Sequence, residues 1–201
     1  MRIYLASRSP RRRELLTQMG IAFDTVAFRD GARADAHTDE TPLPGESPVV
    51  YVERVARAKA DHGSQIIDSR KLPRRLILSA DTTLEFAGEI IGKPVDAADA
   101  SAILQRLSGQ THRVLTGVAV NHQGRTDVVL STREVRFRPL DEEEIRHYVM
   151  SGEPMDKAGA YGIQGRAGMF VEYLAGSYTG VMGLPVCETG ELLKRVGFRV
   201  L

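Results

Sequence analysis

A serine- and arginine-rich segment, SRSPRRR at residues 7–13, lies between a short apolar stretch and a helical pattern. Ser9 is a good N-cap, and Pro10 suits the first position of a helix. Free backbone N–H groups at a helix N-terminus bind anions, and hydroxyl and guanidinium groups add charge-assisted hydrogen bonds to phosphate oxygens. The segment therefore suits phosphate binding, although a capped helix with solvated surface arginines explains the same residues. The chain contains no GxxxxGK[ST] sequence, which excludes a P-loop.

A single aspartate, Asp81, follows the most apolar stretch of the chain, LILSA at residues 76–80. That stretch predicts an interior strand, and ligand sites in α/β sheets favour the carboxyl ends of such strands. An aspartate there can bind a divalent metal ion or accept a proton from an attacking water. The structural alternative is a turn cap. Lys93, in a Gly-Lys-Pro turn, could neutralise phosphate charge near Asp81; alone it would be an ordinary surface lysine.

Further acidic residues occur in a polar segment at residues 29–48, whose Asp, Gly, Pro and Thr content predicts a mobile loop. Asp39 and Glu40 lie in this loop, and Arg57 and Lys59 lie on the helix expected after it. Mg²⁺ takes one or two carboxylates together with substrate phosphate oxygens, so carboxylates from separate segments suit it. Taken alone, such loop acids are usually solvated charges.

Small residues are concentrated at residues 156–165, DKAGAYGIQG. This composition permits close approach of the backbone to a ligand, and it also suits a flexible connector. Gln164 can both donate and accept hydrogen bonds, as the edge of a pyrimidine base requires. His112 and His122 have no metal-ligand spacing with other candidates, so we interpret both as structural or surface residues.

Hydrophobic periodicity and turn residues predict the elements that must position these groups. Strands are expected at residues 3–6, 21–28, 76–80, 83–86, 89–91, 114–121 and 126–137. Helices are expected at residues 11–19, 48–62, 96–107, 141–150 and 188–196. Because strands and helices alternate irregularly, the predicted class is α/β or mixed α+β with a mixed sheet. The whole chain, 1–201, is expected to form a single domain or two closely packed lobes.

Composition narrows the class of partner. The net charge is only +1, from 27 basic and 26 acidic residues, which argues against a general nucleic-acid binder and favours a small anionic ligand. The N-terminus does not read as a signal peptide, and no apolar stretch approaches the roughly 20 residues of a membrane span. We therefore expect a cytoplasmic protein without membrane contact. The single cysteine, Cys187, excludes a disulfide framework and a CxxC site, and its apolar context predicts a buried structural thiol.

Several blocks of the sequence occur in the same order in one known family. They are LASRSPRRRELL, a DE pair before YVERVARAKA, SADTTLEFAGEIIGKP, LSGQTHRVLTGVAV, DKAGAYGIQG and GLPVCET. Through most of the chain these blocks resemble the Maf family of nucleotide pyrophosphatases. The resemblance implies an elongated mixed α/β fold with a cleft between two lobes, related to the inosine-triphosphate pyrophosphatases.

The resemblance also implies roles for individual residues. Asp81 corresponds to the catalytic base that activates water, and Glu40 to a loop acid that, with Asp81, holds a divalent cation, Mg²⁺ or Mn²⁺. Arg11, Thr82 and Gln164 mark the branch that hydrolyses dTTP and UTP, rather than the branch that prefers 7-methyl-GTP. The substrate- and phosphate-binding positions correspond to Ser7, Ser9, Arg11, Arg12, Lys59 and Lys93. Residues 29–38 form a longer segment than close bacterial members have, which leaves the metal ligands of that loop open.

Two alternatives to a dTTP and UTP pyrophosphatase remain at this stage. One is a broader hydrolase that prefers modified pyrimidine nucleotides, because such modifications leave the pyrimidine edge contacts of Gln164 largely intact. The other is a nucleotide-binding regulator of cell division or septum formation without essential catalysis, against which the presence of Asp81 argues. Homodimers occur in the family, and no feature of the sequence decides the oligomeric state.

Overall fold

Three long strands form the spine of the protein in this computed structural model, which describes residues 2–26 and 38–200. They are β3 (Ile77–Phe86), β5 (Thr111–His122) and β6 (Arg125–Phe137), and β5 pairs antiparallel with both of the others. The β5–β6 hairpin turns at Gln123 and Gly124, whose φ angles of 53° and 81° are those of a tight hairpin turn. The two strands expected at residues 114–121 and 126–137 are therefore present, and they pair with each other.

Four shorter strands complete a seven-stranded sheet within the described residues: β1 (Arg2–Leu5), β2 (Ala22–Thr25), β4 (Glu89–Ile91) and β7 (Val171–Ala175). The strand order is β2-β1-β3-β5-β6-β7, and β4 pairs with the far end of β3. β1 runs parallel to both β2 and β3, whereas all other pairs are antiparallel. The sheet is mixed, as the sequence predicts. Residues 27 and 28 of the expected second strand lie outside the described residues.

The helices begin where short polar side chains can cap them. Ser9, Asp96 and Asp141 cap α1 (Pro10–Gln18), α3 (Ala97–Leu107) and α4 (Glu142–Met150), respectively, and accept hydrogen bonds from backbone N–H groups of the first turn. The cap at Ser9 confirms the sequence prediction, and Asp96 caps the helix expected at residues 96–107. The remaining helical segments are α2 (Pro48–Ser69), α5 (Tyr178–Met182), α6 (Val186–Arg195) and the 3₁₀ turns η1 (Glu153–Asp156), η2 (Ala158–Ala160) and η3 (Arg166–Phe170).

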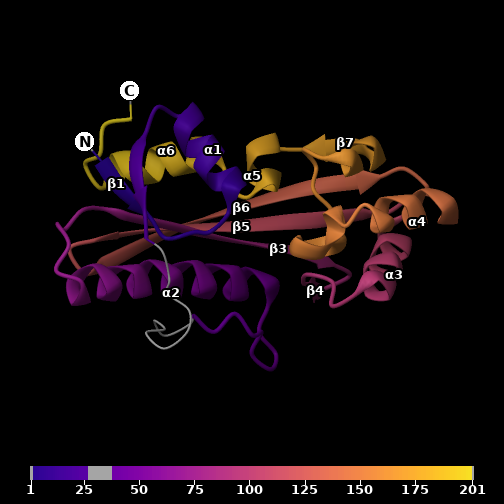
Figure 1. The fold of residues 1–201 in the computed structure, drawn as a ribbon, viewed down its shortest axis with the longest axis horizontal. Coiled ribbons are helices and arrows are strands. Elements are labelled where there is room, and N and C mark those ends of the chain that lie inside the picture. The colour runs from indigo at the N-terminus through magenta and orange to yellow at the C-terminus, as the bar shows by residue number, and fades with distance from the viewer. Residues whose placement is uncertain (1, 27–37, 201) are drawn as a thin grey trace.

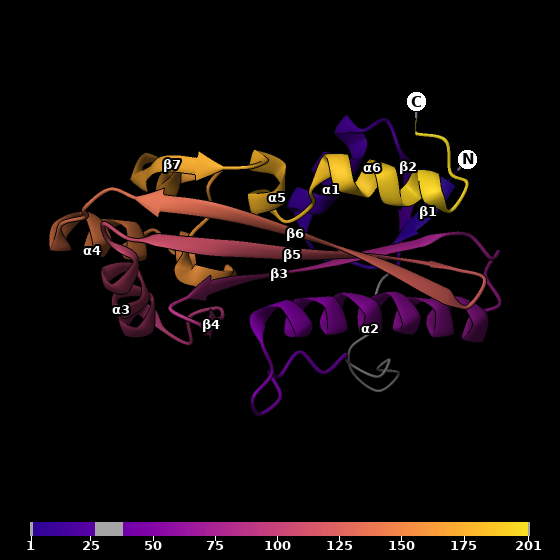
Figure 2. The same cartoon turned by 180° about the vertical axis from the view of Figure 1, so that it is seen from behind.

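The helices divide the sheet into two halves (Figures 1 and 2). Around one half, α2 covers one face, and α1 and α6 cover the other. The other half carries α3, α4 and the 3₁₀ turns, which pack around Phe137 in a second apolar cluster. Alternation along the strands decides which side chains enter which layer. On β3, Leu78 and Ala80 face the α1 and α6 side, whereas Ser79 donates a hydrogen bond to a carbonyl of α2.

Three local expectations are wrong. Residues 76–80 and 83–86 are not separate strands, because β5 pairs with β3 continuously from Ile77 to Glu85 and carries the strand through Asp81. Helix α2 continues to Ser69 instead of ending near residue 62, since Ile66 and Ile67 bury further apolar surface beneath the sheet. Cys187 is exposed on α6, whose buried side is formed by Leu192 and Leu193.

A glycine in β5 sets the distance between α2 and the sheet. A Cβ atom at Gly117 would lie 2.7 Å from the carbonyl oxygen of Val52 and 3.3 Å from the Cβ atom of Ala56. Both residues belong to α2, so any side chain at this position would force the helix away from the strands. Gly117 is the register partner of Asp81 on β3. The closest packing of α2 therefore occurs beside Asp81.

His112 is a structural residue of the second cluster, as the sequence predicts. Its Nε2 atom lies 2.8 Å from the hydroxyl oxygen of Tyr161, and its ring makes edge contacts with Phe137 and Tyr161. Burial disfavours the imidazolium form and lowers the pKa of His112 to about 4. The folded protein therefore holds this histidine neutral at pH values where an unfolded chain would protonate it.

We predict that His112 makes the protein less stable as the pH falls. The ordinary histidine pKa is 6.5 and the folded value is about 4, so between these values only the unfolded state gains the proton. A variant His112→Phe should lose roughly 2 kcal/mol less unfolding free energy than the wild type between pH 7 and pH 5. Urea unfolding at both pH values measures this difference. His147→Gln, at an exposed histidine, serves as the control, and an unchanged pH slope in His112→Phe would contradict the prediction.

Candidate active site

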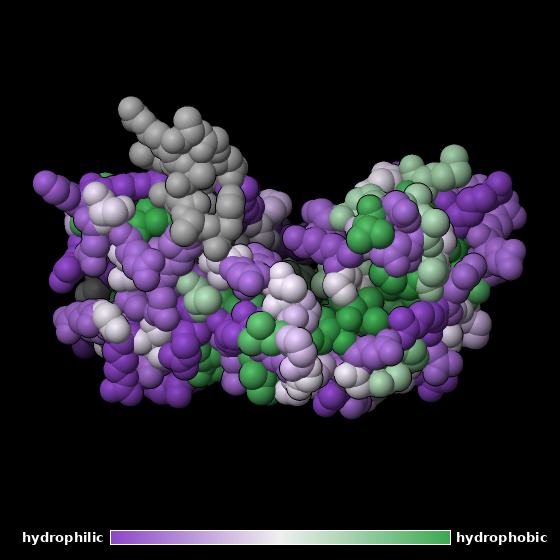
Figure 3. Space-filling view, turned by 90° about the horizontal axis from the view of Figure 1, so that it is seen from below, coloured by the Kyte–Doolittle hydropathy of each residue, from purple (hydrophilic) through white to green (hydrophobic). Residues whose placement is uncertain are grey.

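A gap in the pairing of β3 creates the principal cleft. β1 pairs with β3 only at Ile77 and Leu78, and β4 pairs with it only from Leu84 to Phe86. The β3 edge between them, residues 79–83, is left without a strand partner on this side among the described residues. A cleft of about 760 Å³ opens there, and Figure 3 shows the surface hollowed between the two halves. Because the edge is open, side chains from both faces of the sheet reach one cavity.

All of the site residues predicted from the sequence line this cleft. They are Ser7, Ser9, Arg11, Arg12, Glu40, Lys59, Asp81, Thr82, Lys93 and Gln164. One part of the prediction is wrong, because Asp81 lies in the middle of β3 and not at the carboxyl end of a strand. The cleft lies instead beyond the carboxyl end of β1, where the chain turns into α1.

Lys59 joins two carboxylates at one end of the cleft. Its ammonium nitrogen lies 2.7 Å from Oδ1 of Asp81 and 2.9 Å from Oε1 of Glu40. Asp81 is only 6% exposed, and a carboxylate so placed needs a nearby cation to offset the loss of hydration. The ion pair holds Asp81 in one orientation beside the open edge of β3. Arg57, the other basic residue noted on this helix, donates instead to the carbonyl of Thr126 on β6.

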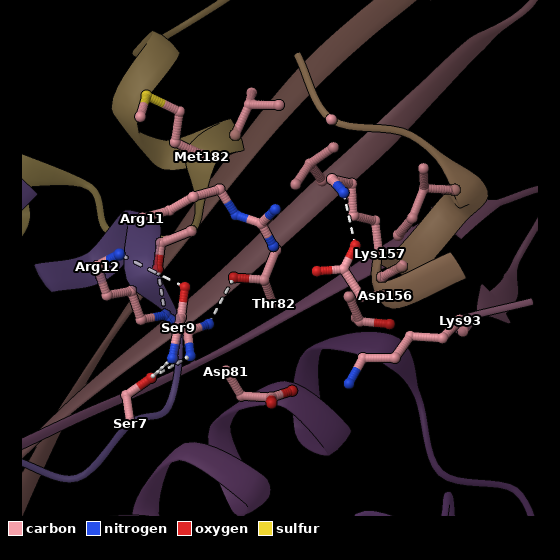
Figure 4. Close-up of a pocket in the computed structure, with 18 of the residues that line it drawn as sticks. Ser7, Ser9, Arg11, Arg12, Asp81, Thr82, Lys93, Asp156, Lys157 and Met182 are labelled. Carbon is pink, nitrogen blue, oxygen red and sulfur yellow. Dashed lines mark hydrogen bonds and ion pairs between the residues drawn. The ribbon is translucent and has the colours of Figure 1, made fainter. Parts of the chain in front are cut away.

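Arg12 reaches the same cleft from α1 and is fixed by three hydrogen bonds (Figure 4). Its Nε donates to the carbonyl of Gly183 at 2.8 Å, and its two terminal nitrogens donate to the hydroxyls of Ser7 at 3.2 Å and Thr82 at 3.1 Å. Burial lowers the pKa of Arg12, although the charge of Asp81 acts in the opposite direction. A guanidinium has five N–H donors, so two remain for an anionic ligand.

The hydroxyl groups of Ser7 and Ser9, in the turn between β1 and α1, already accept hydrogen bonds from other groups of the protein. Ser9 accepts the capping hydrogen bond from the backbone of Arg12 at 3.4 Å, and the backbone N–H of Ser9 donates to Ser7 at 3.2 Å. Both serines thus order the turn between β1 and α1. This turn sets the N-terminus of α1 and its arginines against the cleft, which suits an anion.

Charged residues of the opposite wall face these arginines. Figure 4 shows Arg11 pointing into the cleft and Lys93 entering it from the other side. Lys157 donates to Asp156 at 2.5 Å. Burial raises the pKa of Asp156, whereas the hydrogen bond from Lys157 and the charge of Arg11 lower it, with a net decrease. The sequence indicates that segment 156–165 can approach a ligand, but Asp156 and Lys157 were not predicted as cleft residues; their charge within a glycine-rich run was the available signal.

Part of the cleft lining is apolar. Gln164 is exposed at the cleft and follows the buried Ile163 in the chain. The other apolar lining residues of the cleft include Tyr161, Leu84, Ile90, Val114, Val181 and Met182. Such a lining, with one amide at its rim, can hold a flat ring and hydrogen-bond its edge.

Arg54 of α2 forms hydrogen bonds with the part of the polar loop that the structure describes, residues 38–47. It donates to both carboxylate oxygens of Glu46, at 2.6 and 2.8 Å, and to the carbonyls of Asp39 at 3.3 Å and Thr41 at 3.0 Å. The hydrogen bond from Arg54 lowers the pKa of Glu46, which keeps the pair ionised. Residues 29–37 of the predicted mobile loop lie outside the described residues.

Tyr51 holds the loop backbone at Glu40, the loop residue whose carboxylate pairs with Lys59. Its hydroxyl donates to the backbone carbonyl of Glu40 at 2.9 Å. Burial and the charges of Asp81 and Glu40 raise the pKa of Tyr51 to about 12, so the hydroxyl keeps its proton. Tyr51 and Arg54 thus hold the backbone of the loop where the Glu40 side chain reaches Lys59. The sequence pattern gave no signal for either role, because both residues look like ordinary helix positions.

A matching family model, described as Maf-like protein, covers residues 2–196. The chain belongs to the Maf family. Among its Maf relatives, a dTTP/UTP pyrophosphatase of Dechloromonas aromatica (strain RCB) is 80% identical over 201 residues, which is 100% of both chains. A dTTP/UTP pyrophosphatase of Aromatoleum aromaticum is 63% identical and covers 98% of this chain and 96% of its own.

A solved structure, the Staphylococcus aureus Ham1 protein, is also similar, with a TM-score of 0.48 and 15% identity, covering 68% of this chain and 72% of its own. Over residues 2–26 and 38–200, no helix of this Maf protein is long and apolar enough to cross a membrane.

We predict that removal of the Arg54 side chain frees the loop around Glu40. Arg54→Met should raise the amide hydrogen-exchange rates of residues 39–46 by about tenfold, because Glu46 and two loop carbonyls lose their donor. Exchange in the central strand β5 should not change. Arg57→Met is the matched control, since it removes an arginine from the same helix that bonds to β6. Equal exchange of the loop in both variants would show that Arg54 does not restrain it.

Proposed function

We propose that this chain is a nucleoside triphosphate pyrophosphatase that hydrolyses dTTP and UTP to the nucleoside monophosphate and pyrophosphate. The observation that carries the proposal is a carboxylate, Asp81, held by Lys59 at the edge of a cleft whose other walls present Arg12 and Lys93. The full-length relatives named dTTP/UTP pyrophosphatase support the same reaction. A nucleotide pool enzyme of this kind acts in the cytoplasm.

Asp81 serves as the general base. Water attacks the α-phosphorus, which lies between the nucleoside oxygen and the α,β-bridging oxygen. The proton of the water passes to a carboxylate oxygen of Asp81. The bond from phosphorus to the bridging oxygen breaks, and pyrophosphate leaves with the negative charge. The ion pair with Lys59 holds the Asp81 carboxylate in one orientation at the edge of the cleft.

The cations of the cleft stabilise the leaving group. The two unused N–H donors of Arg12 suit two phosphate oxygens, and Lys93 adds a second positive charge from the opposite wall. Ser7 keeps Arg12 in place through its hydroxyl oxygen. Such fixed donors stabilise charge that grows in the transition state without reorganisation.

The residues present fit a divalent cation. Glu40 and Asp81 both lie within 3 Å of the Lys59 ammonium nitrogen, so two carboxylates from separate segments lie close to each other at the cleft. Within residues 2–26 and 38–200, no three His, Cys, Asp or Glu side chains gather as a complete ligand set. The remaining ligands of Mg²⁺ or Mn²⁺ would then be phosphate oxygens and water, which is how Mg²⁺ commonly binds. The chemistry such an ion supplies when bound is neutralisation of phosphate charge.

We assign the pyrimidine preference to Gln164 and to the apolar part of the cleft lining. Gln164 can meet the donor and acceptor pattern of a pyrimidine edge while the apolar lining holds the ring. We assign Arg11, Thr82 and Gln164 as the residues that distinguish pyrimidine from purine nucleotides. The apolar lining also suits a methyl group on the ring, so 5-methylated substrates belong in the test.

Pyrophosphate release from a panel of nucleoside triphosphates tests the proposal. With Mg²⁺ or Mn²⁺ present, we expect release from dTTP, UTP and 5-methyl-UTP, and little from purine nucleotides. Asp81→Asn should lower kcat by roughly 10²- to 10⁴-fold, the usual contribution of a general base. Asp96→Asn, which keeps its helix cap, is the matched control.

Each other result has a definite meaning. Release chiefly from 7-methyl-GTP would overturn the assignment of Arg11, Thr82 and Gln164 but keep the reaction. No release from any nucleotide would favour the regulator without catalysis, particularly if Asp81→Asn still bound dTTP normally.

A further inference from the structure

Thr116 carries a buried hydroxyl in the middle of β5. Alternation places it on the same face as Val114 and Val118, which belong to the two different core clusters. Thr116 is 0% exposed and is not among the residues that line the cleft. A hydroxyl buried at this depth costs free energy unless it is hydrogen-bonded, so its partners show what the position requires.

The hydrogen bonds of Thr116 have only one consistent direction. Its Oγ1 donates to the carbonyl oxygen of Gly180 at 3.0 Å, and a hydroxyl has a single hydrogen. The 3.0 Å contact between Thr116 Oγ1 and Thr82 Oγ1 therefore requires Thr82 to donate. Thr82 in turn accepts from the Arg12 guanidinium at 3.1 Å. The chain of bonds runs from Arg12 through Thr82 and Thr116 to Gly180, and both hydroxyl hydrogens are committed.

The same short helix holds Arg12 a second time. Gly180 lies in α5, and Gly183 is the residue directly after that helix. The carbonyl oxygen of Gly183 accepts a hydrogen bond from Nε of Arg12 at 2.8 Å. Gly183 has a φ of 103°, and a Cβ atom there would lie 3.1 Å from Oγ1 of Thr82. The α5 segment, β3, β5 and α1 thus meet in one closed hydrogen-bonded ring around the guanidinium.

We propose that Thr116 is a positioning residue that orients Arg12 for the phosphates of the substrate through Thr82. The Thr82 hydroxyl then acts on the phosphates through Arg12, and its hydrogen is committed to Thr116, so any part that Thr82 takes in pyrimidine selectivity does not involve donation of this hydrogen to the nucleobase. With three N–H groups of Arg12 fixed by protein oxygens, the remaining two are aimed at the cleft before the substrate arrives. This inference rests on the proposed function, in which Arg12 binds phosphate.

A matched pair of substitutions tests the relay. Thr116→Val keeps the shape of the side chain and removes the hydroxyl, whereas Thr116→Ser keeps the hydroxyl. We expect Thr116→Val to raise KM for dTTP and for UTP by about tenfold each, the cost of losing one hydrogen bond to an oriented charged group. The ratio of the two KM values should not change, because the relay acts on the phosphates. Thr116→Ser should restore KM to within about twofold of the wild type.

Binding without turnover separates the relay from the proposed function. In the Asp81→Asn background, calorimetry should show dTTP binding weakened about tenfold by Thr116→Val but not by Thr116→Ser. Adding Thr116→Val to Arg12→Lys should weaken binding no further, since the relay acts only through the guanidinium. Equal binding by the Val and Ser variants, or full additivity with Arg12→Lys, would overturn the relay even if dTTP is hydrolysed.

The outcome stays decisive if Thr116→Val does not fold. Thr82→Val interrupts the same chain at a partly exposed residue, and the relay predicts the same tenfold loss and the same non-additivity with Arg12→Lys. Melting temperatures of all variants identify loss of folding. Failure of the wild type to release pyrophosphate from any nucleotide would instead overturn the proposed function itself.

Discussion

Asp81 carries its carboxylate in the middle of a strand that pairs with β5 from Ile77 to Glu85, a place where an unpaired buried charge would cost free energy. The ammonium of Lys59 makes the position tolerable, but only if α2 packs close enough to deliver it. Gly117 allows that approach, because any side chain there would meet the backbone of Val52. The close approach of α2 to the sheet at Gly117 and the Lys59–Asp81 ion pair therefore occur at the same place in the fold.

The open edge of β3 explains how a site can lie in mid-sheet. Asp81 and Thr82 are neighbours in sequence, so alternation points them to opposite faces, towards α2 and α1 respectively. If β1 or β4 were a few residues longer, the edge would be paired and the two faces would be separate. The short partners keep it open, and one cavity collects a carboxylate from one face and a guanidinium from the other.

Local features could be predicted from the sequence, whereas features that depend on pairing could not. The caps at Ser9 and Asp96 follow from residues within one turn of each helix. By contrast, the polar run at Asp81 looks like the end of a strand, and only the continuous register with β5 makes it the middle of one. Cys187 was misjudged for a similar reason: its neighbours are apolar, but the helix turns its own side chain to solvent. The cleft residues were predicted from residue type, local context and family blocks, not from periodicity.

Helix phase separates arginines that the sequence presents as equivalent. Consecutive residues on a helix point about 100° apart, so the side chains of Arg11, Arg12 and Arg13 cannot share one environment. Arg12 is enclosed by oxygens from three other segments, Arg11 points into the cleft without such anchors, and Arg13 is exposed. A fixed guanidinium suits a phosphate whose position the chemistry dictates, and a free one can adapt to whatever the rest of the ligand requires. The basic run thus divides into parts with different tasks, and one of the groups that set Arg12 apart is the Gly183 carbonyl near the other end of the chain.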